Sequence, residues 1–178
     1  MKQRFRFAWI GASLVLLLAP AGAQSVRHSF ESDSAITCDA CAGWNAAIEP
    51  FKIFGNTYYV GTAGLSSVLV TSDRGHILLD GALPQSAALI DRNIRRLGFR
   101  TEDIKLIVSS HAHFDHAGGI HALQRASGAT VAASAAGANA LTRGDNPPDD
   151  PQYAPGQGTR FPRVRRVRIV TDAETLRI

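Results

Sequence analysis

Hydrophobic and polar residues alternate along the first half of the chain in the manner of short β-strands. The strand-like segments span residues 51–54, 57–61, 66–71 and 76–80. Turn residues separate them, and the link 72–75 ends on a glycine, which tolerates a positive φ. The pattern predicts an antiparallel β-meander that follows an irregular arm over residues 24–50.

Farther along, the pattern predicts strands that alternate with helices. Apolar residues recur at helical spacing from Gln85 to Leu97, and Gly98 follows as a C-cap. Additional strands are predicted over 104–110 and 129–134, with additional helices over 118–127 and 136–143. The alternation indicates a mixed α/β fold.

The C-terminal region predicts a loop and then a hairpin. Residues from Asp145 to Pro162 are rich in Pro, Gly and Asp and are expected to form the loop. Residues 164–170 and 175–178 are expected to be the two strands of a terminal hairpin that turns at 172–174.

The first 23 residues have the layout of a secretory signal peptide. A basic segment contains Lys2, Arg4 and Arg6, an apolar core spans 7–18, and small residues at 21–23 form the cleavage site. The apolar core is too short to span a bilayer. We therefore predict a folded domain over 24–178 that is periplasmic or secreted and, after signal cleavage, has no membrane partner.

Without the signal peptide, the net charge falls from +4 to +1. The arginines near the C-terminus alternate partly with apolar residues, as on the solvated face of a strand, and no nucleic-acid partner is predicted. These arginines are Arg160, Arg163, Arg165, Arg166 and Arg168.

The only cysteines, Cys38 and Cys41, are expected to form a local disulfide because an exported protein meets an oxidising environment.

The richest group of potential metal ligands follows the apolar segment 104–110. The sequence His-Ala-His-Phe-Asp-His begins at His111 and places three imidazoles and one carboxylate within six positions. In an extended segment His111 and His113 point the same way and can chelate one ion, whereas Asp115 and His116 follow where the chain turns and can hold a second. Imidazole with one carboxylate favours zinc over magnesium or calcium, with iron and manganese left open.

This motif, with Leu-Leu-Asp-Gly at 78–81, resembles the metallo-β-lactamase superfamily, whose fold is an αββα sandwich of the α/β (α+β) class. The segments 55–62, 64–66, 69–72 and 83–86 are similar to the class B β-lactamases of the third subclass. The resemblance runs nearly continuously from about Cys38 to the last residue.

The resemblance implies a role for each residue of the motif. His111 and His113 would bind a first zinc ion, Asp115 and His116 would bind a second, and Asp115 is also assigned the catalytic role. Asp80 would brace the metal loop through hydrogen bonds, although a simple turn role fits its sequence position equally well. His121 is interpreted as a residue of the helix surface.

The implied activity is zinc-dependent hydrolysis of the amide bond of a small-molecule β-lactam, with metal-bound hydroxide as nucleophile and antibiotic resistance as the result. The family completes both zinc sites with histidines from a C-terminal half, whereas no histidine follows His121 here. We therefore expect the N-terminal half of the sandwich only, a C-terminally incomplete domain with one sheet face uncovered. Two alternatives stay open: a lactone or thioester hydrolase with the same zinc motif, and an inactive fragment.

Overall fold

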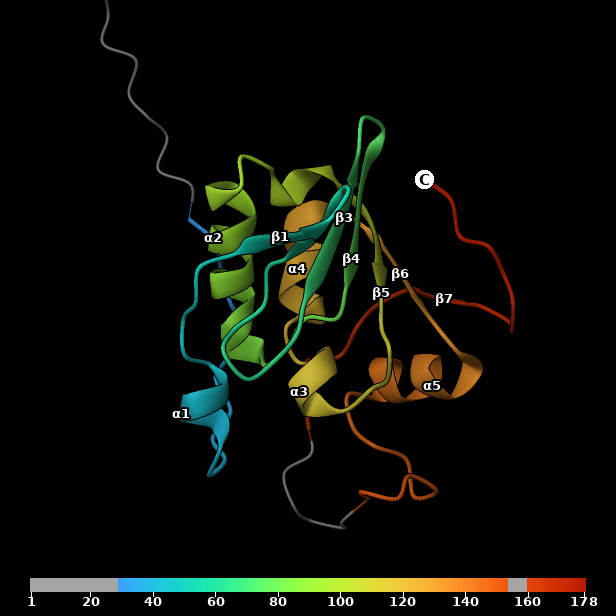
Figure 1. Cartoon of the computed structure of the whole chain (residues 1–178). Coiled ribbons are helices and arrows are strands. Elements are labelled where there is room, and N and C mark those ends of the chain that lie inside the picture. Colours follow the sequence, from blue (N-terminus) through green and yellow to red (C-terminus); the bar gives the residue numbers. More distant parts are fainter. Residues whose placement is uncertain (1–28, 154–159) are drawn as a thin grey trace, which may run out of the picture.

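A computed structural model describes residues 29–153 and 160–178 of the chain. The described residues contain one seven-stranded sheet whose strand order follows the sequence from β1 to β7 (Figure 1). The predicted signal peptide and its cleavage site lie outside the described residues. The mixed α/β class predicted from the sequence is confirmed.

The first four strands form the predicted antiparallel meander. They are β1 (Phe51–Phe54), β2 (Thr57–Tyr59), β3 (Val68–Ser72) and β4 (Gly75–Leu79). Each pairs antiparallel with the next, and Ser72 lies opposite Gly75 at the β3–β4 hairpin. Gly75 has a φ of 131°, which explains the glycine at this turn.

The remaining strands are parallel and are connected through helices. The strands are β5 (Ile104–Val108), β6 (Thr130–Ala133) and β7 (Val167–Ile169). The helices are α2 (Ala87–Arg96), α3 (Phe114–Ala117), α4 (Ile120–Ser127) and α5 (Ala135–Arg143). Strands β4 to β7 run parallel, so their carboxyl ends lie along one edge of the sheet, where the loops of such sheets form binding sites.

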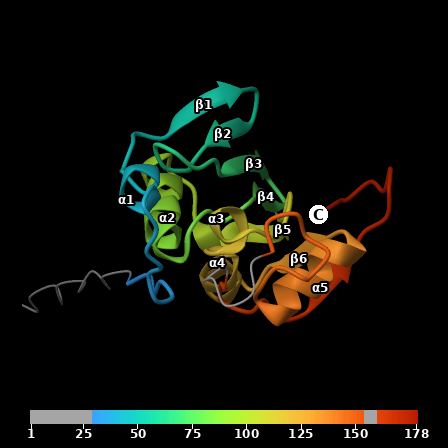
Figure 2. The same ribbon diagram turned by 90° about the horizontal axis from the view of Figure 1, so that it is seen from below.

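The main core lies between the sheet and helices α2 and α4, which are on the same side of the sheet (Figure 2). Ile90 and Ile94 of α2 and Leu123 of α4 are fully buried, as are Leu78 and Ile107 of the sheet. The helical periodicity therefore predicted the packed face of α2. The helix ends where Gly98 was predicted to end it, although the C-cap itself is Leu97 and Gly98 follows it with a φ of 86°.

The opposite face of the sheet is only partly covered. Val68, Leu79 and Val108 are register neighbours on β3, β4 and β5, and Leu79 is 39% exposed while the other two are half-buried. The sequence-based expectation of an incompletely covered sheet face agrees with these exposures.

The predicted C-terminal hairpin is wrong. Strand β7 is short and pairs parallel with β6, and residues 175–178 form no strand. The carboxylate of Glu174 instead accepts a hydrogen bond from the Thr171 backbone N–H at 3.1 Å and pairs with Arg168. These local contacts satisfy the turn without a second strand.

The N-terminal arm is less irregular than predicted, because it contains the short helix α1 (Cys41–Trp44). The predicted disulfide between Cys38 and Cys41 is confirmed, and it joins the first residue of this helix to the segment before it. In the described ranges, none of the helices has both the length and the apolar character needed to cross a bilayer.

Candidate metal centre

The four predicted ligand residues lie at the carboxyl end of β5, where the chain leaves the sheet. Ser109 still donates its backbone N–H to the carbonyl of Ala132 at 3.0 Å, so the neighbouring strand fixes the start of the metal loop. The second half of the motif was predicted as a turn, but Asp115 and His116 lie on the short helix α3. The backbone N–H of His116 donates to the carbonyl of His113 at 3.0 Å, which starts this helix.

The segment after β4 fastens helix α3 to the sheet. Gly81 donates its N–H to the carbonyl of His116 at 2.8 Å, and Gly119 donates its own to the carbonyl of Ala82 at 3.1 Å. A Cβ atom at Gly119 would lie 2.2 Å from the carbonyl oxygen of Gly81. The glycine that closes the motif is therefore required by close backbone packing.

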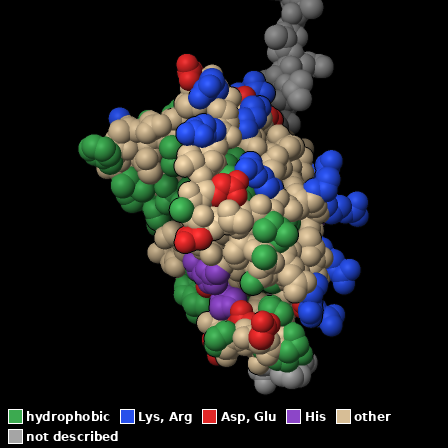
Figure 3. Space-filling model, turned by 90° about the vertical axis from the view of Figure 1, so that its right-hand side faces the viewer, with side chains coloured by type: hydrophobic (Ala, Val, Ile, Leu, Met, Phe, Trp, Pro, Cys, Tyr) green, Lys and Arg blue, Asp and Glu red, His purple; other side chains and the backbone are tan. Residues whose placement is uncertain are grey.

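The three imidazoles of the motif gather at one place on the surface. The ring centroids of His111 and His113 are 4.6 Å apart, and those of His111 and His116 are 4.0 Å apart. Asp115 Oδ2 lies 3.7 Å from Nε2 of His116. Figure 3 shows histidine side chains on this face with acidic side chains next to them.

Asp80 binds the metal loop through its carboxylate. Oδ1 accepts the backbone N–H of Ser110 at 2.8 Å, while Oδ2 accepts the Ser110 hydroxyl at 2.6 Å and Nδ1 of His116 at 2.9 Å. Asp80 is buried and has a φ of 59°, a conformation that Asp tolerates better than most residues. These are the hydrogen bonds predicted for a brace of the loop.

Each histidine of the motif has one ring nitrogen in contact with a protein oxygen. The contacts are His111 Nδ1 with Ser110 Oγ at 3.1 Å, His113 Nε2 with Asp150 Oδ2 at 2.9 Å, and His116 Nδ1 with Asp80 Oδ2 at 2.9 Å. The second ring nitrogen of each forms no hydrogen bond with the part of the chain that the structure describes. Histidines that bind metals have this arrangement, because the hydrogen bond at one ring nitrogen orients the ring so that the other nitrogen can bind the metal.

The surroundings shift the pKa values of two of these histidines in opposite directions. The hydrogen bond to Asp80 raises the pKa of His116 above its ordinary value. Burial lowers the pKa of His111, and the neighbouring His116 and His113 lower it further. His111 is therefore biased toward the neutral form, which is the form that binds a metal ion.

The donor atoms fit zinc in their chemistry. Imidazole nitrogen and carboxylate oxygen are zinc ligands, and a set dominated by imidazole is unsuited to magnesium or calcium. The side chains of each predicted ligand pair are adjacent: His111 lies next to His113. Asp115 lies next to His116. Across residues 29–153 and 160–178, however, no three His, Cys, Asp or Glu side chains are placed to hold one ion. The ligand roles of these four residues stay predictions.

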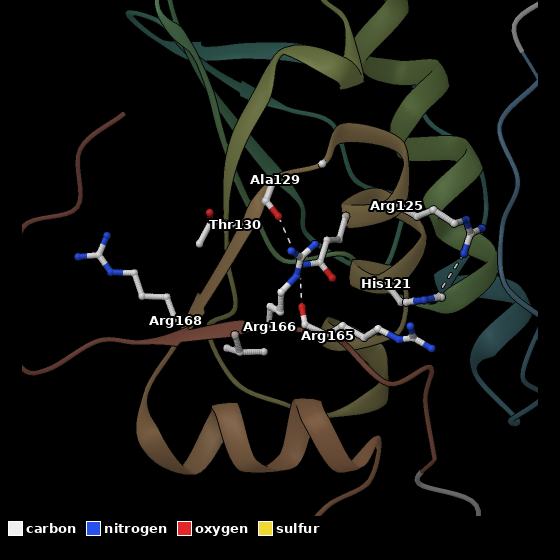
Figure 4. Close-up of a pocket in the computed structure, with 10 residues that line it drawn as sticks. His121, Arg125, Ala129, Thr130, Arg165, Arg166 and Arg168 are labelled. Carbon is white, nitrogen blue, oxygen red and sulfur yellow. Dashed lines mark hydrogen bonds between the residues drawn. The ribbon is translucent and has the colours of Figure 1, made fainter.

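A groove of about 790 Å³ lies elsewhere, between helix α4, the start of β6 and residues 165–168 (Figure 4). None of the four predicted ligand residues lines it. His121 of α4 does, and its Nδ1 lies 3.0 Å from the carboxylate of Asp33, as suits a partly exposed helix residue. Arg125 also pairs with Asp33, while Arg168 pairs with Glu174. All five arginines of the C-terminal cluster are exposed, as predicted.

The same fold occurs in known proteins. The family model of the metallo-beta-lactamase superfamily matches residues 60–175, which include the whole candidate metal centre. The chain belongs to this superfamily. Rm3 metallo-beta-lactamase is 54% identical, with a TM-score of 0.76 over 80% of this chain and 52% of that one. MEM-A1, a subclass B3 metallo-beta-lactamase from a soil metagenome library, is 52% identical, with a TM-score of 0.73 over 76% and 50%.

Two more proteins are similar to the chain. SMB-1, solved in a complex with mercaptoacetic acid, is 47% identical, with a TM-score of 0.71 over 75% of this chain and 51% of that one. An N-acyl homoserine lactonase of Bacillus cereus is 32% identical over 74 residues, which cover 30% of that protein. The chain thus spans about half the length of the solved metallo-beta-lactamases it matches. The resemblance to the third subclass of class B enzymes is confirmed.

Proposed function

We propose that this chain contributes the motif-bearing part of a zinc-dependent hydrolase that opens the amide bond of β-lactam antibiotics. The observation that supports this most strongly is the group of three imidazoles, each with one nitrogen held by a protein oxygen and the other left for a ligand. The identity of 54% to a metallo-beta-lactamase over 80% of the chain supports the choice of substrate class.

In the proposed site, His111 and His113 bind one zinc ion and Asp115 and His116 bind another. Zinc at such sites makes a hydroxide nucleophile available near neutral pH and stabilises developing negative charge. His111 and His113 would hold their zinc ion through the ring nitrogens that form no hydrogen bond with the described residues. The Asp115 side chain is 23% exposed, which lets it contact the reactants directly and orient the attacking water.

Asp80 has a supporting part in this proposal. Because its carboxylate can only accept hydrogen bonds, Nδ1 of His116 must carry the proton. The lone pair of His116 is then on Nε2, the nitrogen that faces Asp115. A proton held at Nδ1 thus sets which atom of His116 is available as a ligand.

The proposed setting is the periplasm or the exterior of the cell, where β-lactams meet their targets. The signal-peptide pattern of the first 23 residues supports export. Hydrolysis there would confer antibiotic resistance. The proposed partner is a small-molecule substrate, and the solvated arginines give no support to nucleic-acid binding.

Hydrolysis of a chromogenic cephalosporin by the purified, zinc-loaded full-length protein tests the proposal. We expect turnover that disappears after prolonged dialysis against a chelator and returns with added zinc. His113→Ala should lower the turnover strongly, whereas His121→Ala, outside the motif, should retain it. Undiminished turnover after removal of zinc would contradict the proposed role of the metal.

A lactone is the second candidate substrate, and it is supported by the similarity to an N-acyl homoserine lactonase. That similarity covers 74 residues, far fewer than the similarity to the β-lactamases, which covers 80% of the chain. A homoserine lactone offered beside the cephalosporin separates the two. Faster opening of the lactone than of the β-lactam would replace the first proposal by the second.

A further inference from the structure

Asp150 contacts the metal centre from a loop that is distant in the sequence. It lies between α5 and β7, 37 positions from His113, and its Oδ2 is 2.9 Å from the imidazole Nε2. Both side chains are mostly buried, with 16% of His113 and 18% of Asp150 exposed. Partial burial weakens competition from water and strengthens this hydrogen bond.

The Asp150 carboxylate is itself held in place by its own loop. Its Oδ1 accepts the backbone N–H of Gln152 at 2.7 Å. The backbone N–H of Asp150 donates to the carbonyl of Pro147 at 3.0 Å, which closes the turn. The carboxylate that faces His113 is therefore fixed in position by its own loop.

This geometry decides which nitrogen of His113 is available. A carboxylate only accepts hydrogen bonds, so the proton of the neutral ring must be on Nε2 and the lone pair on Nδ1. Nδ1 is also the nitrogen of His113 that forms no hydrogen bond with the described residues. Without an acceptor at Nε2, the ring is free to rotate and to change tautomer.

We propose that Asp150 is a positioning residue of the metal centre, which fixes the ring of His113 and presents its Nδ1 to the metal ion. The inference rests on the proposed function in that His113 is taken as a metal ligand. It adds a residue that the sequence motif does not contain and gives the 145–153 loop a task at the site. A loop anchor without a role at the metal would form the same contact and hold the same tautomer, but its loss would leave the metal affinity unchanged.

Asp150→Asn tests this against Asp149→Asn, which removes the same charge from the exposed neighbouring position. An asparagine side chain can donate or accept, so it no longer favours one tautomer of His113. Competition between the protein and a chromophoric chelator then measures zinc affinity. Loss of a group that orients a metal-binding histidine lowers affinity by about 10- to 100-fold. We expect a loss of that size in Asp150→Asn and none in Asp149→Asn.

A second measurement needs neither metal nor variant. Nitrogen NMR of the metal-free protein should show His113 of the unaltered chain as the Nε2–H tautomer. A predominant Nδ1–H tautomer, or equal zinc affinity of the two variants, would overturn the proposal. Failure of the unaltered protein to bind zinc would instead remove the proposed function, while the tautomer result still tests the contact with Asp150.

Discussion

Removal of the Asp80 carboxylate should destabilise the protein more than any other single change at the candidate metal centre. The carboxylate accepts three hydrogen bonds, two from Ser110 and one from His116, and it is 7% exposed. Hydrogen bonds to a charged group contribute roughly 1.5–3 kcal/mol each, and bonds that share one acceptor group are not additive. Asp80→Ala should therefore lower the free energy of unfolding by about 4 kcal/mol.

Two further substitutions separate the causes. Asp80→Asn keeps an oxygen for the Ser110 backbone N–H and should cost only about half as much. Asp80→Gly loses the same hydrogen bonds as Asp80→Ala but removes the cost of a side chain at a φ of 59°. The glycine variant should consequently be about 1 kcal/mol more stable than the alanine variant.

Urea denaturation of the metal-free protein, followed by circular dichroism, measures these differences. Asp73→Asn serves as control, because Asp73 is exposed on the β3–β4 turn and its replacement should change stability by less than about 0.5 kcal/mol. A loss below about 1 kcal/mol for Asp80→Ala would refute the claim that Asp80 braces the metal loop.

Three other predictions concern packing, pH and the disulfide. Gly119→Ala should cost about 1–3 kcal/mol in urea denaturation, because its Cβ would lie 2.2 Å from the Gly81 carbonyl oxygen, and an unchanged midpoint would contradict this. In the metal-free protein, NMR should show His116 titrating above its ordinary pKa. The extra stabilisation that the positive charge of His116 gives beside Asp80 is present below the ordinary pKa of histidine and is lost as the pH rises through the raised pKa, while the neutral ring keeps its Nδ1–H hydrogen bond. The stability advantage over Asp80→Asn should therefore shrink in that range. Replacing Cys38 by Ser opens a very short loop and should cost no more than about 2 kcal/mol in thermal denaturation, whereas a larger loss would indicate a wider role for the disulfide.

The sequence predicted those parts of the fold in which local periodicity and packing agree. The buried residues Ile90 and Ile94 recur at helical spacing, and the meander strands end at residues that favour turns. The prediction failed over 175–178, where strand-like alternation exists but Glu174 closes a local turn. Local propensity cannot foresee a single side chain that satisfies the backbone in another way.

The candidate site was predictable to the extent that it is contiguous in sequence. His111 and His113 attract attention because they are two positions apart at the end of a strand. Helix α3 was missed because four residues are too few to show helical periodicity. Asp150 was missed because its loop meets His113 only through the tertiary fold, and nothing in the local sequence separates it from the exposed Asp149.

Zinc binding by the metal-free protein is the most direct test of the central claim that the histidine motif is a metal centre. A titration with zinc in competition with a chromophoric chelator should show binding by the unaltered chain and its loss in the double variant His111→Ala, His113→Ala. His121→Ala is the matched control and should bind as the unaltered chain does. Equal binding by the double variant and the unaltered chain would place the metal elsewhere and contradict the account.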